Sequence, residues 1–154
     1  MTEITRRTLL TTAAALGATA AWAGKPALSR TGWQERRELY PEGVASGDPD
    51  NTSVLLWTRR PSENGQGDIP LAVEVAEDPH FHHVVAHSKT RALKESDWTV
   101  RVLVGGLKPA TEYWYRFTDT DGNGSRIGRT ITAPASDDAQ RVNFAFVSCQ
   151  NANY

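Results

Sequence analysis

The chain has 154 residues, of which 39% are apolar, and its 17 Lys and Arg residues nearly balance its 18 Asp and Glu residues. This apolar content argues against an intrinsically disordered chain, and the single cysteine excludes an intrachain disulfide framework. A formal net charge of -1 argues against nucleic-acid binding, because proteins that bind the phosphate backbone need a clustered excess of Lys and Arg.

The amino-terminal residues 1–23 have the layout of an export signal. Arg6 and Arg7 precede an uncharged stretch, 8–24, which is too short and too rich in Thr and Gly for a stable membrane span of about 20 apolar residues. An A-x-A pattern ends at Ala23, so we expect cleavage after this residue and no stable membrane insertion afterwards. The order T-R-R-x-L-L is similar to that of twin-arginine signals, which predicts recognition by the twin-arginine export machinery and a periplasmic or extracellular location. An ordinary secretory signal that contains two arginines is the alternative.

The segment 24–42 is charged, and its own arginine pair, Arg36 and Arg37, is not followed by an apolar run. A second export signal is therefore excluded. We expect a solvated linker or a short helix ahead of the first domain.

From Gly43 onward the apolar residues recur every second position, which is typical of half-buried strands. Turn-forming pairs such as Asn64-Gly65 and Asp78-Pro79 separate these alternating runs. Roughly seven strands between 43 and 133 predict a mainly β domain, an antiparallel β-sandwich of the fibronectin type III or immunoglobulin-like class.

One local pattern supports this fold class. Leu107, Pro109, Thr111 and Tyr113 form L-x-P-x-T-x-Y, which resembles the tyrosine corner of fibronectin type III domains. In such a corner the ring packs in the core and the hydroxyl bonds the backbone a few residues upstream. Ala110 stands where that family often has glycine, so we expect a slightly strained turn.

The run 53–58 predicts a strand that is apolar on both faces, and we expect Trp57 to be its central core aromatic. A sandwich strand needs only one apolar face. Val54 and Leu56 therefore lie either against a turn within the domain or under something outside it, and the sequence leaves both possibilities open.

The last part of the chain predicts the start of a second domain. A polar linker, 134–140, leads to the nearly continuous apolar run 142–147, which is typical of a strand buried on both faces. A lone strand is not a stable domain. We therefore expect 141–154 to begin a larger α/β unit that is truncated here, with Cys149 just beyond the carboxyl end of its first strand, where sites form in such units.

Five segments, in this order behind the export signal, are together similar to the amino-terminal part of PhoD-like alkaline phosphatases: GVASGDP at 43–49, VLLWTR at 54–59, GLKPATEY at 106–113, GRT at 128–130 and FAFVSCQN at 144–151. The resemblance implies an exported phosphoric ester hydrolase that acts on phosphomonoesters and phosphodiesters and uses Fe(III) and Ca²⁺. It also implies that Cys149 is an iron ligand at the start of a metallophosphatase domain. The other ligands would lie further along, so we expect the chain alone to be inactive and to bind neither metal stably.

Alternatives remain at three points. Cys149 could instead be a buried core thiol. The four histidines, His80, His82, His83 and His87, fit exposed loop positions better than a metal site, because they follow a turn and have no thiol nearby. A stand-alone secreted binding module is the alternative to an enzyme fragment, and the natural substrate stays open among monoesters, diesters, phospholipids and cell-wall polymers.

Overall fold

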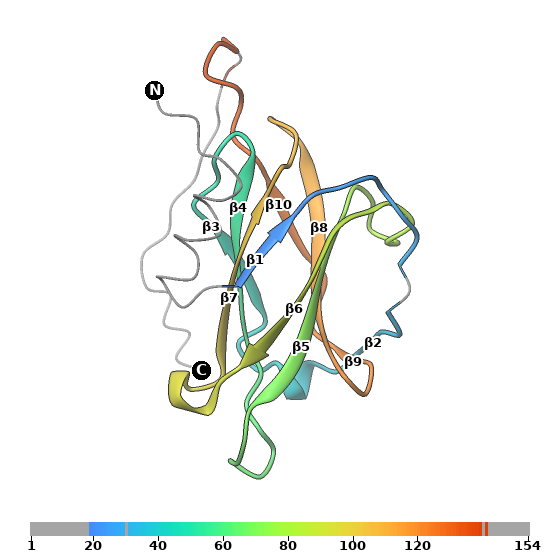
Figure 1. The fold of residues 1–154 in the computed structure, drawn as a ribbon, viewed down its shortest axis with the longest axis vertical. Coiled ribbons are helices and arrows are strands. Elements are labelled where there is room, and N and C mark those ends of the chain that lie inside the picture. Colours follow the sequence, from blue (N-terminus) through green and yellow to red (C-terminus); the bar gives the residue numbers. More distant parts are fainter. Residues whose placement is uncertain (1–18, 30, 140, 142–154) are drawn as a thin grey trace, which may run out of the picture.

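The computed structural model describes residues 19–29, 31–139 and 141 (Figure 1). Within them the chain forms ten strands and two short 3-10 helices. The strands are β1 (Thr19–Trp22), β2 (Gln34–Glu35), β3 (Val44–Gly47), β4 (Ser53–Arg59), β5 (Ile69–Ala76), β6 (Val84–Ala92), β7 (Thr99–Gly105), β8 (Glu112–Asp119), β9 (Asn123–Gly124) and β10 (Gly128–Ile131); the helices are η1 (Arg37–Leu39) and η2 (Lys94–Ser96).

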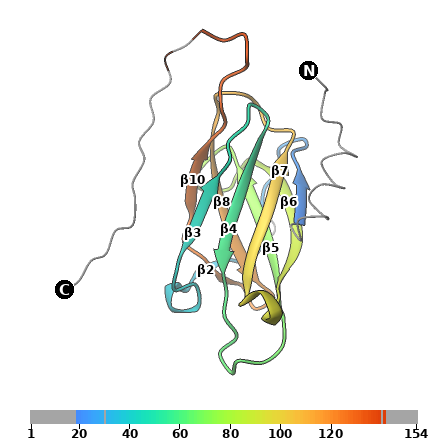
Figure 2. The ribbon, with the colours of Figure 1, turned by 90° about the vertical axis from the view of Figure 1, so that its left-hand side faces the viewer.

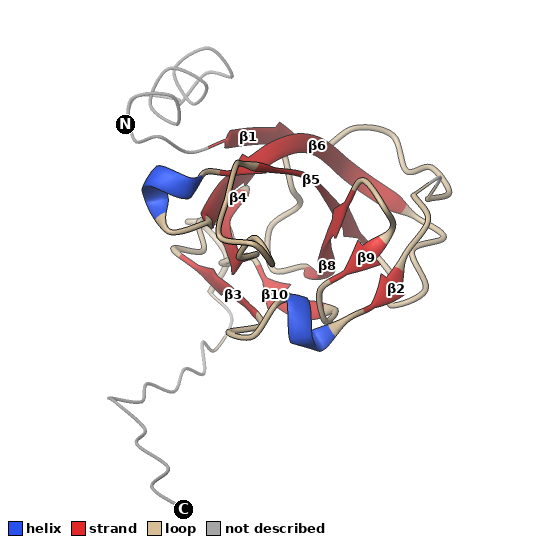
Figure 3. Ribbon diagram, turned by 90° about the horizontal axis from the view of Figure 1, so that it is seen from below, coloured by secondary structure: helices blue, strands red, loops and turns tan. Residues whose placement is uncertain are grey.

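The strands form two sheets that face each other across the core (Figure 3). One sheet has the order β1-β7-β4-β3, and the other has the order β2-β9-β8-β5-β6, with β10 paired to β8. The pairs among β3, β4 and β7, and among β5, β6, β8 and β10, are antiparallel. The expected fold class is confirmed: the domain is a mainly β sandwich of the fibronectin type III or immunoglobulin-like class.

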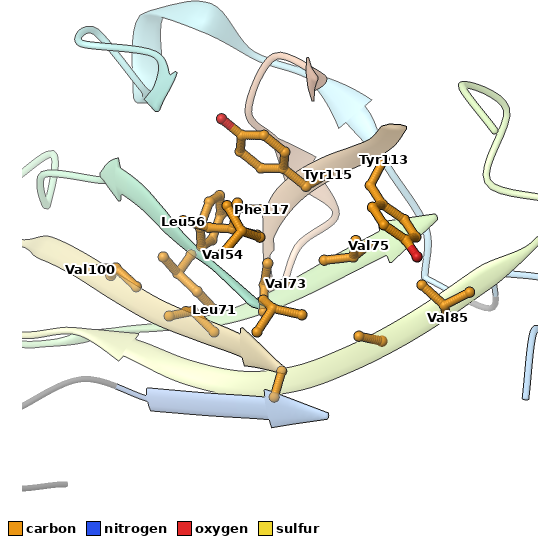
Figure 4. Packing of buried hydrophobic residues seen from close by; sticks show 14 of the residues in the cluster. Val54, Leu56, Leu71, Val73, Val75, Val85, Val100, Tyr113, Tyr115 and Phe117 are labelled. Carbon is orange, nitrogen blue, oxygen red and sulfur yellow. The ribbon is translucent and has the colours of Figure 1, made fainter. Parts of the chain in front are cut away.

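Alternating side chains fill the space between the sheets, as the period of two predicts. Val54 and Leu56 of β4 lie opposite Val73 and Val75 of β5, and the ring of Phe117 packs edge-on to Tyr115 with centroids 6.5 Å apart (Figure 4). All of these side chains are almost completely buried. Each buried aliphatic side chain of this size stabilises the fold by about 1.5–3 kcal/mol relative to exposure.

The prediction for Trp57 is wrong. Val54, Leu56 and Thr58 point into the core, so Trp57 and Leu55 lie on the outer face of β4, where they are only half-buried. Thr58 tolerates its buried position because its hydroxyl donates to the Gly43 carbonyl oxygen at 2.8 Å. The structure thus places Val54 and Leu56 inside the domain, and Leu55 and Trp57 form the second apolar face of the strand.

The segment 24–42 is not simply a solvated linker. Strand β2 pairs in parallel with β9, and Leu39 and Tyr40 are buried in the main core. The Tyr40 hydroxyl donates to the Asn123 carbonyl oxygen at 3.0 Å, which satisfies its polar end. The pairing of β2 and the burial of Leu39 and Tyr40 make this part of the segment belong to the sandwich.

The corner at Tyr113 has the geometry that its sequence pattern predicts. The ring is 1% exposed, and its hydroxyl oxygen accepts a hydrogen bond of 2.9 Å from the backbone N–H of Lys108. Ala110 has a φ of 47°, in the left-handed region that suits glycine. The neighbouring Leu107 is buried in the same core. The corner therefore fixes the connection between β7 and β8.

We expect Tyr113→Phe to lower the free energy of unfolding by on the order of 1 to 2 kcal/mol, because the partly buried N–H of Lys108 loses its acceptor while the ring still fills the core. Urea denaturation of the chain measures this change. An unchanged midpoint and slope would show that the hydroxyl does not stabilise the corner.

Candidate functional site

Several residues that the sequence singles out for export or chemistry lie outside the described part of the chain. Cys149, Arg6 and Arg7 are among them, so the structure tests neither the iron ligand nor the arginine pair. Ala23 is described: it follows β1 directly, and its N–H donates to the Gly105 carbonyl oxygen at 2.7 Å. Across residues 19–29, 31–139 and 141, no group of three His, Cys, Asp or Glu side chains could hold a metal ion. In the same residues, no helix has the length and apolar character needed to cross a membrane.

The histidine-rich loop between β5 and β6 is organised by Asp78. The carboxylate accepts hydrogen bonds from the backbone N–H groups of His80, His82 and His83, at 2.9, 3.2 and 2.7 Å. Partial burial tends to raise the pKa of Asp78, but these three donors hold it below its usual value. The rings of His82 and His83 are exposed, as expected, whereas His87 lies in β6 rather than in the loop. The loop is thus a turn capped by a carboxylate.

A buried ion pair occupies the outer face of the second sheet. Glu74 of β5 and Arg116 of β8 are direct cross-strand neighbours, 3% and 7% exposed, and an Arg116 Nη2 to Glu74 Oε2 distance of 2.8 Å joins them. The guanidinium also lies 4.0 Å from the centre of the buried Phe81 ring. Outer sandwich faces are normally solvated, so something must cover this pair.

The cover is an amino-terminal strap, residues 24–29 and 31–33. The hydroxyl of Ser29 donates to both carboxylate oxygens of Glu74, at 2.8 and 2.9 Å, and Thr31 donates to Oε1 at 2.9 Å. Arg116 Nη2 also donates to Ser29 Oγ at 2.9 Å, and Trp33 stacks over the guanidinium at 5.2 Å. These contacts make the strap part of the folded domain. Sequence reasoning missed them because charged residues at strand positions usually indicate a solvated face.

A second buried ion pair joins Arg60, the residue after β4, to Asp119, the last residue of β8. Arg60 Nη2 donates to Asp119 Oδ2 at 3.0 Å, and both side chains are almost fully buried. Asp119 also accepts from the backbone N–H groups of Asp121 and Asn123. Burial, followed by the nearby Asp119 carboxylate, raises the pKa of Tyr40, whose ring packs against Arg60. Through the Asp119 carboxylate, this pair shapes the turn before β9.

The described chain leaves the sandwich at the end that carries the β3–β4 turn (Figure 2). The N–H of Thr132 donates to the Thr111 carbonyl oxygen, and the N–H of Ala133 donates to that of Asp50, both at 3.1 Å. The Ala133 carbonyl oxygen also accepts from the N–H of Ala110 at 3.0 Å, and among the described residues no backbone hydrogen bond joins a later residue to the sandwich. The sandwich therefore fixes the point from which residues 134 onward depart.

Comparison with known proteins matches residues 25–134 to the family model described as PhoD-like phosphatase, N-terminal domain. The chain belongs to this family. It is 41% identical over 115 residues to alkaline phosphatase D of Bacillus subtilis (strain 168), an alignment that covers 70% of this chain and 20% of that protein. A solved structure described as the structure of PhoD matches with a TM-score of 0.58 and 39% identity, over 62% of this chain and 19% of that one. The chain thus spans about a fifth of the length of the PhoD-like phosphatase that it matches.

The family match confirms the resemblance that the sequence motifs carry. It also shows where the domain begins and ends along the chain. It begins at residue 25, within the strap, and ends at 134, just after the hydrogen bond of Ala133. The PhoD-like N-terminal domain thus contains the strap and its contacts with Glu74 and Arg116, whereas strand β1 lies ahead of the matched residues.

Proposed function

We propose that this chain is the amino-terminal part of an exported, metal-dependent alkaline phosphatase and phosphodiesterase. The observation that carries the proposal is the family match of residues 25–134 together with the close similarity to alkaline phosphatase D. The substrates are phosphate esters, bound by parts of the protein beyond this domain. We expect no turnover by the chain alone, because the remaining ligands of the proposed metal site lie further along the protein.

Cys149 is the iron ligand in this proposal, with Fe(III) and Ca²⁺ as the resident metals of the whole protein. Two observations support the assignment to a site outside the sandwich. The histidines nearest to one another have their backbone N–H groups on Asp78 and their rings in solvent. Both buried carboxylates, Glu74 and Asp119, are neutralised by arginines. A thiolate is also a strong ligand for iron.

Export by the twin-arginine route can be tested together with activity. In a bacterium that expresses the whole protein, we expect hydrolysis of p-nitrophenyl phosphate and bis-p-nitrophenyl phosphate in the exported fraction. Replacing Arg6 and Arg7 together by Lys should leave uncut precursor in the cytoplasm and lower the exported activity by about tenfold or more, because twin-arginine recognition reads the guanidinium pair and not charge alone.

The matched control replaces Arg36 and Arg37 by Lys, since this second pair lies in the folded domain and precedes no apolar run. That variant should be exported normally. Normal export of the first variant would show an ordinary secretory signal, and an exported whole protein that hydrolyses neither ester would contradict the enzymatic proposal.

A further inference from the structure

Strand β1 occupies the edge of the first sheet. It pairs in parallel with β7, with Thr19 opposite Val102 and Trp22 opposite Gly105. Addition of a strand at a sheet edge is one way in which extended peptides bind to proteins, because the backbone hydrogen bonds can be made by any sequence. The segment that forms β1 is the carboxyl-terminal end of the expected leader.

The same strand also contacts the edge of the second sheet (Figure 3). The hydroxyl groups of Thr19 and Thr90 of β6 are 2.7 Å apart, and Ser88 of β6 donates to the Ala20 carbonyl oxygen at 3.2 Å. Ala21 is 5% exposed and belongs to the main core. β1 therefore lies in a groove between the edges of β7 and β6, which we call the β1 groove, and closes this side of the sandwich.

Trp22 ends the strand in close contact with the backbone. Its ring lies against Gly106, where a Cβ would come within 2.6 Å of the indole Nε1. Gly106 has a φ of 75° and follows the last residue of β7. The absence of a side chain at this position makes room for the indole.

The hydrogen bonds of the backbone change partner at the expected cleavage site. The N–H of Ala23 donates to Gly105 of β7, and the N–H of Gly24 donates to Val85 of β6, each at 2.7 Å. Beyond this point the strap has anchors of its own, since Ala27 forms a bridge with Val84 and Ser29 binds Glu74. The family match begins at residue 25, so β1 lies outside it. The Ala23–Gly24 bond thus lies between β1, which the expected cleavage would remove, and the strap, which has anchors of its own.

We propose that the β1 groove is a binding site for the end of the leader, and that docked β1 withholds the Ala23–Gly24 bond from the leader peptidase. This inference rests on the proposed export of the protein. A peptidase binds its substrate in an extended conformation through backbone groups, and β7 already holds those of β1. Once β1 leaves the groove, water is added across the bond, the carboxylate remains on Ala23, and the new amino terminus is Gly24. After cleavage, the strap still covers Glu74 in the mature domain.

The first test weakens docking without altering the leader. Gly106→Ala places a methyl group against Trp22, and Gly43→Ala is the matched control, because Gly43 has a similar φ of 71° and a Cβ added there would meet no atom within 4 Å. We expect purified Gly106→Ala precursor to be cut by leader peptidase in detergent about tenfold faster than the parent and the control, which corresponds to docking weaker by about 1.4 kcal/mol. Equal rates for all three proteins would overturn the proposal.

The second test fixes β1 in place. In a chain that carries Cys149→Ser, the pair Thr19→Cys and Thr90→Cys puts two thiols where the hydroxyls now touch, within reach of a disulfide. The oxidised precursor should be cut at least about tenfold more slowly than the reduced one, and each single variant should be insensitive to reductant. The product should begin at Gly24. An oxidised precursor cut at the reduced rate, or a mature protein that begins at or before Thr19 and retains β1, would overturn the proposal.

These assays separate the two proposals. Cleavage at equal rates overturns only the role of the β1 groove and leaves the exported phosphatase untouched. A precursor that the peptidase does not cut even after denaturation overturns the leader itself, and with it both the groove and the export step. Export that is independent of Arg6 and Arg7 overturns only the twin-arginine route, because the cleavage assay uses purified protein.

Discussion

Glu74→Leu is expected to lower the free energy of unfolding by about 3–5 kcal/mol, the usual cost of removing one partner of a buried ion pair. The variant leaves the guanidinium of Arg116 buried against Phe81 with Ser29 as its remaining polar neighbour. Ser29 and Thr31 lose their acceptor as well, so the strap should detach from the sheet. Urea denaturation measures the stability, and limited proteolysis within residues 24–33 reports the release of the strap.

The matched control is an exposed cross-strand pair on the same sheet. Glu112 of β8 and Arg129 of β10 are diagonal neighbours, and a distance of 3.4 Å joins Arg129 Nη1 to Glu112 Oε1 between two exposed side chains. Glu112→Leu should cost no more than about 1 kcal/mol, because water already screens this pair. The double variant Glu74→Leu/Arg116→Leu should recover part of the loss, since no charge is then left buried. A loss from Glu74→Leu as small as that from Glu112→Leu would show that the buried pair does not hold the strap.

The strand pattern and the tyrosine corner are predictable from the sequence because both depend on local chemistry. A period of two in apolar residues requires one buried face, and turn residues between the runs separate the strands. The corner pattern ending at Tyr113 is likewise local: the hydrogen bond spans only the five residues back to Lys108. Such features survive in a single sequence because no distant partner decides them.

The errors have a common physical origin in partners that are distant along the chain. Strand β4 is apolar on both faces, and the register with β3 and β7, not the size of the indole, turns Trp57 outward. Glu74 and Arg116 resemble an ordinary solvated face in the sequence because the strap that covers them lies more than 40 residues earlier. The sequence does not predict the burial of Leu39 and Tyr40 either, because their core partners are also distant along the chain. Register and cover are set by tertiary packing, which overrides local patterns.

For the candidate site too, local motifs can be read from the sequence, whereas features that depend on distant partners cannot. The family can be inferred from short motifs, and the comparisons confirm it. The iron-ligand role proposed for Cys149 requires further ligands outside this chain, and the described sandwich adds only the position from which the chain departs, at Ala133 beside Asp50. The described residues thus give the place where the chain leaves the sandwich and do not test the role of Cys149.

In the whole protein, Cys149→Ser is expected to lower both the iron content and the turnover of phosphate esters by about tenfold or more, the range in which changes at and around metal ligands usually fall. Serine has nearly the size of cysteine, but its hydroxyl is a much weaker anionic donor than a thiolate. Metal analysis of the purified protein gives the iron content independently of activity. Hydrolysis of p-nitrophenyl phosphate gives the turnover.

The melting temperature and a neighbouring variant distinguish a ligand from a buried thiol. Ser148→Ala, one residue earlier, should retain iron and turnover, since it removes a hydroxyl and no thiolate. If Cys149 is an iron ligand, alkylating agents should modify it only after the metal is removed, because coordination engages the sulfur electrons that would attack the reagent. If it is a core thiol, the serine variant should melt at a lower temperature with iron and turnover intact, since a buried hydroxyl without a partner costs stability but holds no metal. That second pattern would remove Cys149 from the proposed site.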